Sequence, residues 1–135
     1  MCSVLDYKEL KDLMENTSHK IVEVYKYIEE ILDTDKAIKV YGKNIFKKVT
    51  EQEVYFITSN KIINVIIQPF TIKTYNIQDI KNIEIEKPNK YEIILRIYTE
   101  DKCIIELNNK KDSEDDWENQ YLKYISDIAN YLVNL

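Results

Sequence analysis

Few residues in this sequence are of the types that carry catalysis. His19 is the only histidine, and Cys2 and Cys103 are the only cysteines. One histidine cannot supply both a nucleophilic triad and a metal cluster. Gly42 is the only glycine, so phosphate-binding loops, dinucleotide-binding turns and nucleophile elbows, which need several glycines, are excluded. We therefore predict no catalytic, cofactor-binding or metal-binding residues, and we expect a protein that is not an enzyme.

Two groups of carboxylates could bind a cation or carry acid–base chemistry. A calcium loop beginning at Asp112 would need Gly and Glu where the sequence has Trp117 and Lys123. These acids instead suit the first turn of a helix, where they complement the helix dipole. Glu84 and Glu86 alternate with isoleucines, so we expect them on the exposed face of a strand with no catalytic role.

Residues 36–111 contain short β-branched and aromatic runs separated by polar turns, a pattern that predicts antiparallel strands. We expect hairpins around residues 42–44, 59–61 and 99–102, the first of them returning as a strand over residues 45–49. Pro69 should interrupt the pattern because proline has no donor for the strand ladder, and Pro88-Asn89 should form a turn. The fold class that follows is α+β, with a bent antiparallel sheet or partly closed barrel of about seven strands.

Three amphipathic helices are predicted, two in residues 1–35 and one in residues 112–135. Ser3 could cap the first, Thr17 or Ser18 the second, and Ser113 the third. Their apolar positions recur every three or four residues, and they are Val4, Leu5, Leu10, Leu13 and Met14; Ile21, Val24, Tyr25, Ile28, Ile31 and Leu32; and Trp117, Tyr121, Ile125, Ile128, Leu132 and Leu135.

The 135 residues suit one domain. Within it we expect a helical segment (1–35), the sheet (36–111) and a helix that closes one end of the sheet (112–135). No apolar run reaches the roughly 18 residues of a membrane span. With no targeting segment and both thiols free, we expect a cytoplasmic protein, in which Cys103 is buried in a strand as a small apolar residue.

The strand and turn pattern of residues 54–135 resembles the bacterial pleckstrin-homology-like (PH/GRAM-like) domains. The matching positions are Thr58, Lys61, Asp79, Ile80 and Ile83. The family often has Arg in place of Lys61, and Gly in the last hairpin in place of Asp101-Lys102. The resemblance implies the bent sheet and terminal helix described above, but not the two leading helices. It also implies that basic residues around the first hairpin, namely Lys43, Lys47 and Lys48, bind phosphate groups, and Lys61 joins them as a candidate anion-binding residue.

Charge is divided along the chain: residues 1–35 and 112–135 each carry a net charge of −5, and residues 36–111 carry +5. We expect a non-catalytic binding module that contacts an acidic or amphipathic segment of another protein. Weak binding of an anionic lipid or phosphate headgroup is the alternative, and an enzyme with an unrecognised site is the second. The leading helices could pair two copies as a homodimer. Nucleic acid is not expected as a partner because the total charge is −5.

Overall fold

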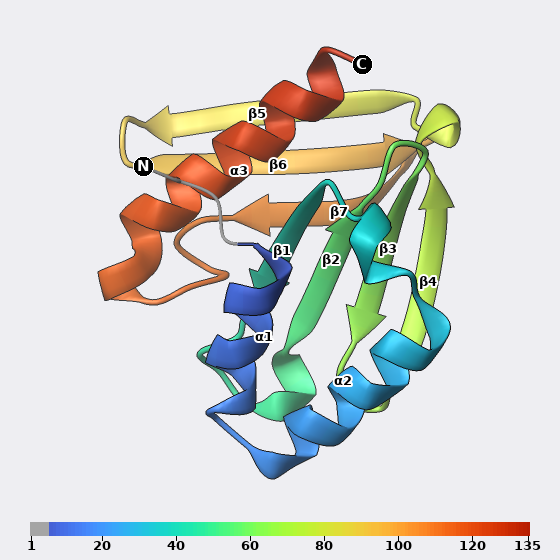
Figure 1. Cartoon of the computed structure of the whole chain (residues 1–135). Helices are drawn as coiled ribbons and strands as arrows, with labels where there is room; N and C mark the ends of the chain where they lie inside the picture. Colours follow the sequence, from blue (N-terminus) through green and yellow to red (C-terminus); the bar gives the residue numbers. More distant parts are fainter. Residues whose placement is uncertain (1–5) are drawn as a thin grey trace. The chain divides into compact units, whose positions relative to one another are not determined.

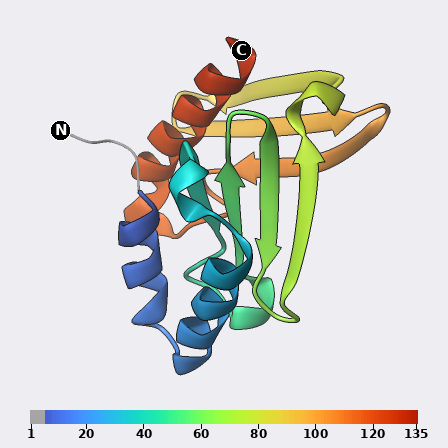
Figure 2. The same ribbon diagram turned by 45° about the vertical axis from the view of Figure 1, so that its right-hand side comes forward.

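The computed structural model describes residues 6–135 and divides them into two compact units. The N-terminal unit ends at Tyr75, and the C-terminal unit runs from Asn76 to Leu135. The described residues form three α-helices and seven strands (Figures 1 and 2), so the predicted α+β class is confirmed. The predicted single sheet or partly closed barrel is not found, because the strands form separate sheets of four and three.

The N-terminal unit combines two helices with the four-stranded sheet. Its elements are α1 (Tyr7–Glu15), α2 (His19–Ile31), β1 (Lys39–Lys43), β2 (Glu53–Ile57), β3 (Lys61–Ile66) and β4 (Thr71–Asn76), with short 3-10 turns at Thr34–Lys36 and Val49–Glu51. The strands follow one another in the sheet in chain order. The predicted hairpin around residues 59–61 is confirmed, since β2 pairs antiparallel with β3.

Side chains define where the two helices begin. Asp6 caps α1 and forms a reciprocal capping box with Glu9, which satisfies two backbone donors at once. Ser18 caps α2 by accepting from the backbone N–H of Lys20, as predicted. The expected cap at Ser3 and the apolar positions Val4 and Leu5 lie outside the described residues.

The helices cover the sheet face that carries Gly42 of β1 and Phe56 of β2. The Tyr7 ring of α1 lies between those of Tyr25 and Phe56, with centroid separations of 5.9 and 5.8 Å. Most of the predicted helical stripe is buried, namely Leu10, Met14, Ile21, Val24, Tyr25 and Ile28. Burying these side chains is the main term that stabilises the unit. Ile31, at the end of the same stripe, is 62% exposed.

The Glu29 carboxylate of α2 links the two helices at the surface through hydrogen bonds to α1. Glu29 accepts hydrogen bonds from the Lys11 ammonium, at 2.8 Å, and from the Tyr7 hydroxyl. These two bonds lower the pKa of Glu29. Burial and the bond to Glu29 raise the pKa of Tyr7. The Lys11–Glu29 pair is partly exposed to solvent, so it contributes only about 0.5 kcal/mol.

The predicted strand over residues 45–49 is wrong, because β1 pairs with β2 and the intervening residues form a compact loop. Asn44 turns the chain with φ 61°, a left-handed conformation that asparagine tolerates. The buried Gln52 amide then donates to the carbonyls of Ile45 and Lys47. These bonds satisfy carbonyls that a strand would have paired with a neighbour.

The C-terminal unit packs one helix on a three-stranded sheet. It contains β5 (Asn82–Asn89), β6 (Glu92–Thr99), β7 (Lys102–Asn108) and α3 (Glu118–Val133), with 3-10 turns at Ile77–Asp79 and Asp115–Trp117. α3 lies across this sheet and contacts β6 and β7 (Figure 1). The buried side chains of the predicted stripe are Tyr121, Ile125, Ile128 and Leu132. Leu135 is 63% exposed.

The entry into α3 differs from the prediction. Ser113 does not cap a helix, because its hydroxyl donates to the carbonyl of Asn109. The N-cap position of α3 is Trp117, which makes no side-chain capping bond. Asp112 instead accepts the backbone N–H of Asn108, and both of these side chains are buried. A buried polar network therefore shapes the turn before the helix. The expected turn at Pro88-Asn89 is also displaced, since both residues belong to β5.

Candidate functional site

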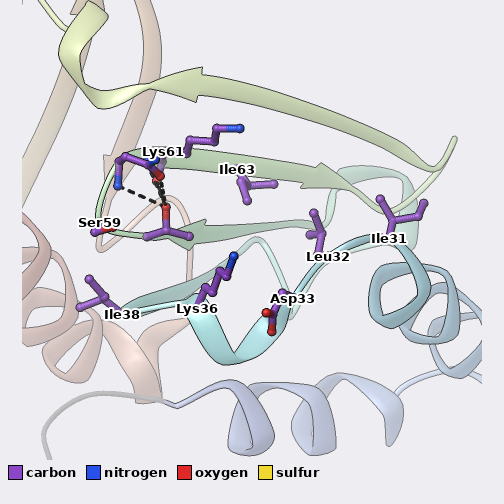
Figure 3. A pocket seen from close by; sticks show the side chains of 10 residues that line it. Ile31, Leu32, Asp33, Lys36, Ile38, Ser59, Lys61 and Ile63 are labelled. Carbon is purple, nitrogen blue, oxygen red and sulfur yellow. Dashed lines mark hydrogen bonds between the residues drawn. The ribbon is translucent and has the colours of Figure 1, made fainter.

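A hollow of about 610 Å³ opens in the N-terminal unit at the end of the sheet where α2 stops. Its walls come from two segments: residues 31–38, which leave α2, and residues 58–63, which form the β2–β3 turn (Figure 3). α2 ends because its C-cap, Leu32, is extended. The chain then continues through a 3-10 turn to β1, so the sheet face beyond Ile31 is left without a covering helix.

The turn that forms one wall is organised by Thr58. Its hydroxyl accepts the backbone N–H of Lys61 at 3.0 Å, and its own N–H donates to the carbonyl of Lys61 at 2.9 Å. A threonine hydroxyl can replace a backbone acceptor in this way. The turn is thus held from within, and the position of Lys61 at the start of β3 is fixed by it.

Isoleucine side chains give the hollow its apolar surface. Ile31 is 62% exposed, Ile38 is 47% exposed, and Ile63 is half-buried. Ile38 is held in place because its N–H donates to the carbonyl of Ile57 at 2.7 Å, which extends the pairing of β1 by one residue. Ile31 and Ile38 lie at opposite sides of the hollow (Figure 3), so the hollow has exposed apolar side chains at both ends.

Two ammonium groups, those of Lys36 and Lys61, belong to the same hollow. In the described part of the chain neither ammonium has a hydrogen bond or ion pair. Asp33 is the carboxylate of this lining; it caps the 3-10 turn by accepting the N–H of Asp35. Lys36 rises from the connection toward the strands, whereas the Asp33 carboxylate points away from them (Figure 3). The hollow therefore presents positive charge.

Ser59 adds donors at the tip of the turn. Within residues 6–135, neither its backbone N–H nor its hydroxyl has a hydrogen-bond partner. Unpaired N–H, hydroxyl and ammonium donors that line one hollow favour anionic oxygens. Chemically, the hollow can bind an apolar side chain and a carboxylate or phosphate together. It offers no nucleophile paired with a base.

The four predicted anion-binding lysines do not come together. The register pairs Lys43 with Glu53 at one end of β1 and Lys39 with Ile57 at the other. Lys61 follows the turn at the Ile57 end. Five residues of strand span about 14 Å, so Lys61 is separated by the length of the strand from Lys43 and from the loop that carries Lys47 and Lys48.

Lys43 and Lys47 also differ from Lys61 in having interactions within the protein. The segment that carries Lys43, Lys47 and Lys48 is therefore not a hairpin. Of the four candidate anion-binding lysines, only Lys61 lines the hollow. Sequence reasoning missed Lys36, Ile31 and Ile38. The exposure of Ile31 could not be predicted, because an apolar residue on a helical stripe normally predicts burial. The exposure of Ile38, just before β1, carried no sequence signal either.

A second polar arrangement lies on the sheet of the C-terminal unit. Arg96 of β6 binds Glu84 at 2.8 Å and Glu86 and Glu106 at 2.9 Å. Glu84 and Glu106 are the direct cross-strand neighbours of Arg96, where opposite charges stabilise pairing. These bonds raise the pKa of Arg96. Glu84 and Glu86 are exposed as predicted, but they serve this ion-pair cluster.

The structure also shows where Cys103 and His19, the other residues considered for chemistry, are placed. Cys103 is exposed rather than buried, since it lies one residue into β7 beside the hairpin turn. His19 is the first residue of α2 and is exposed. Across residues 6–135, no group of three or more His, Cys, Asp or Glu side chains is arranged to hold a metal ion. Every helix in the same range is too short or too polar to cross a lipid bilayer.

The fold and the hollow define a two-unit α+β protein with a preformed concave surface. The chain matches the family described as "Protein of unknown function (DUF3908)" over residues 2–123, and it belongs to that family. The chain matches none of the curated proteins and none of the solved structures with which it was compared. The resemblance to PH-like domains therefore stays a prediction.

Proposed function

We propose that this protein is a non-catalytic binding module, and that its hollow holds an acidic, amphipathic segment of a partner protein. The observation that carries the proposal is the combination of exposed isoleucines with two unpaired ammonium groups, on Lys36 and Lys61, in one concave surface. A partner that buries an apolar side chain there can place a carboxylate beside either lysine.

The size of the hollow supports a side-chain ligand. Its volume of about 610 Å³ lies within the range of about 300–1,000 Å³ typical of binding pockets. Covering Ile31 and Ile38, which are 62% and 47% exposed, gains about 25 cal/mol for each Å² of apolar surface removed from water. The charged rim then sets which apolar segments are accepted, because electrostatic complementarity contributes specificity and association rate.

Anionic lipid or free phosphate is the alternative ligand class. The unpaired donors of Ser59 favour it, since phosphate oxygens accept several hydrogen bonds. Binding through Lys43, Lys47 and Lys48, which the resemblance to PH-like domains implies, is a separate route to the same ligands. We favour protein because the exposed isoleucines would stay in water around a bound phosphate group. A PH-like identity is compatible with either ligand and remains part of the proposal.

Selection from a random-peptide display library tests the proposal. We expect the wild-type protein to enrich peptides in which Asp or Glu flanks Leu, Ile or Phe. The doubly substituted Lys36→Glu/Lys61→Glu protein should bind these peptides at least about tenfold more weakly, because two attractive contacts become repulsive. Lys47→Glu/Lys48→Glu is the matched control, since it changes the charge equally at the other end of the sheet, and it should bind like wild type.

Liposome flotation separates the lipid alternative. With vesicles of anionic lipid at physiological salt we expect no flotation of the wild-type protein. Flotation that Lys47→Glu/Lys48→Glu abolishes would support the lipid route and reject ours. Enriched peptides without acids, or peptides that bind equally to the Lys36→Glu/Lys61→Glu variant, would also reject the hollow as the binding site.

A further inference from the structure

We propose that a second copy of this chain supplies the segment that the hollow binds, through its acidic segment, defined as residues 112–118. This inference rests on the proposed function, because it names the partner of the same surface. The acidic segment has the sequence Asp-Ser-Glu-Asp-Asp-Trp-Glu. Its carboxylates suit the two ammonium groups of the hollow, whereas the Trp117 ring is half-buried and packs edge-on against Tyr121.

The carboxylates of this segment are available. Glu114, Asp115 and Asp116 are exposed, and in the described part of the chain none of them has an ion pair or hydrogen bond through its side chain. Some other acids are engaged in ion pairs: Glu29 binds Lys11, and Glu84 binds Arg96. A partner with two unpaired ammonium groups therefore meets unpaired negative charge at the acidic segment.

The acidic segment is also held in shape. Asp112 accepts the backbone N–H of Asn108 at 2.9 Å, the Ser113 hydroxyl donates to the carbonyl of Asn109, and the N–H of Trp117 donates to the carbonyl of Glu114 at 2.8 Å. The exposed acids thus project from a formed turn. A preorganised segment loses less conformational entropy on binding than a flexible one.

The two surfaces are different: the hollow of one copy meets the acidic segment of the next. Two copies can make this contact reciprocally as a two-fold dimer, or further copies can continue it as a ring or an open chain. The expected association is weak and sensitive to salt, because exposed charges are screened within about 8 Å at physiological ionic strength. This response to salt distinguishes the contact from one that is driven by burial of apolar surface alone, because salt does not weaken such a contact.

Charge reversal on each surface gives the test, read by sedimentation velocity at low salt over a range of concentrations. The hollow variant is Lys36→Glu/Lys61→Glu, and the segment variant is Asp115→Lys/Asp116→Lys. We expect the wild type to exceed the 16.2 kDa mass of the chain as concentration rises, and each variant alone to remain at that mass. Mixing the two should restore association above the mass of one chain, because the intact hollow of one variant meets the intact segment of the other, and the two reversed surfaces also carry opposite charges.

Circular dichroism and thermal melting serve as the check that both variants are folded. Asp115→Asn/Asp116→Asn, which keeps side-chain shape, replaces the segment variant if the lysines unfold the turn, and it too should stay at the mass of one chain. A monomeric wild type, or self-association that survives in the hollow variant, overturns the inference. If acidic peptides bind the wild-type hollow while the mixed variants form no dimer, self-recognition is rejected and the proposed function stands. If peptides also fail to bind, both are rejected.

Discussion

At the residue scale, Gly42 shows why one position in β1 excludes any side chain. A Cβ atom there would lie 2.6 Å from Cδ1 of Leu10 and 2.8 Å from Cγ2 of Ile45. Both neighbours are almost fully buried, so neither can move away without disturbing the packing of α1 or of the loop after β1. A glycine is needed here because Leu10 and Ile45 approach the β1 backbone closely. From the sequence alone, the same glycine had suggested a turn.

The Gly42→Ala substitution should therefore destabilise the protein by about 1–3 kcal/mol, the usual cost of overpacking a filled core. Urea denaturation followed by far-UV circular dichroism measures this loss. Thr74→Ala, on the exposed part of β4, is the control and should change the midpoint little. An unchanged midpoint for Gly42→Ala would show that Leu10 and Ile45 can move aside at low cost.

Single residues also explain where the hollow differs from the predicted site. Lys61 was a candidate because the resemblance to PH-like domains has a basic residue at the start of this strand, and it lines the hollow, while its binding of an anion stays a prediction. Lys36 could not be found, because its importance comes from α2 ending at Ile31 and not from its neighbours in sequence. The predicted basic hairpin does not form, because Asn44 turns the chain and the Gln52 side chain holds the segment as a loop.

At the element scale, local signals predicted local structure. Ser18 and the spacing of apolar residues located α2, and the turn at Ser59-Asn60 located the β2–β3 hairpin. Pairing between distant strands could not be derived, because alternation of apolar residues shows which face is buried but not which strand lies alongside. The 3-10 turn Ile77–Asp79 separates β4 from β5, and β5 pairs with β6 instead.

Asn109 is the residue that joins the elements of the C-terminal unit. Its side chain is fully buried; it accepts the N–H of Ile93 at 2.9 Å and donates to the carbonyls of Tyr91 and Glu118, each at 3.0 Å. These three groups belong to β6, to the turn before it and to the first residue of α3. One amide thus fixes where α3 begins relative to the sheet.

Asn109→Ala should cost about 3 kcal/mol, because it leaves one buried backbone N–H and two part-buried carbonyls without their partner. The fluorescence of Trp117, the only tryptophan, follows unfolding of this unit in urea. Asn119→Ala, at an exposed position of α3, is the matched control and should be nearly neutral. A loss for Asn109→Ala no greater than that of the control would show that water replaces the amide without penalty.

At the scale of the whole molecule, the described residues divide into two compact units, and the single domain expected from the sequence stays a prediction. Their boundary falls between Tyr75 and Asn76, at the end of β4, and the next element begins at Ile77. The junction contains no Gly, Pro or Ser, which are the residues typical of flexible linkers. Each unit has roughly 60 to 70 residues, a size at which a separate core is only marginally stable.

We therefore expect the chain to unfold as one cooperative system. The urea midpoints from Trp117 fluorescence, which reports on the C-terminal unit, and from far-UV circular dichroism, which reports on all helices and strands, should coincide. Gly42→Ala lies in the N-terminal unit and Asn109→Ala in the C-terminal unit, so each should shift both midpoints together. If Gly42→Ala instead leaves the fluorescence midpoint in place while the circular dichroism curve splits into two steps, the units are independent domains. In that case the hollow, whose lining residues all belong to the N-terminal unit, would be lost without unfolding α3.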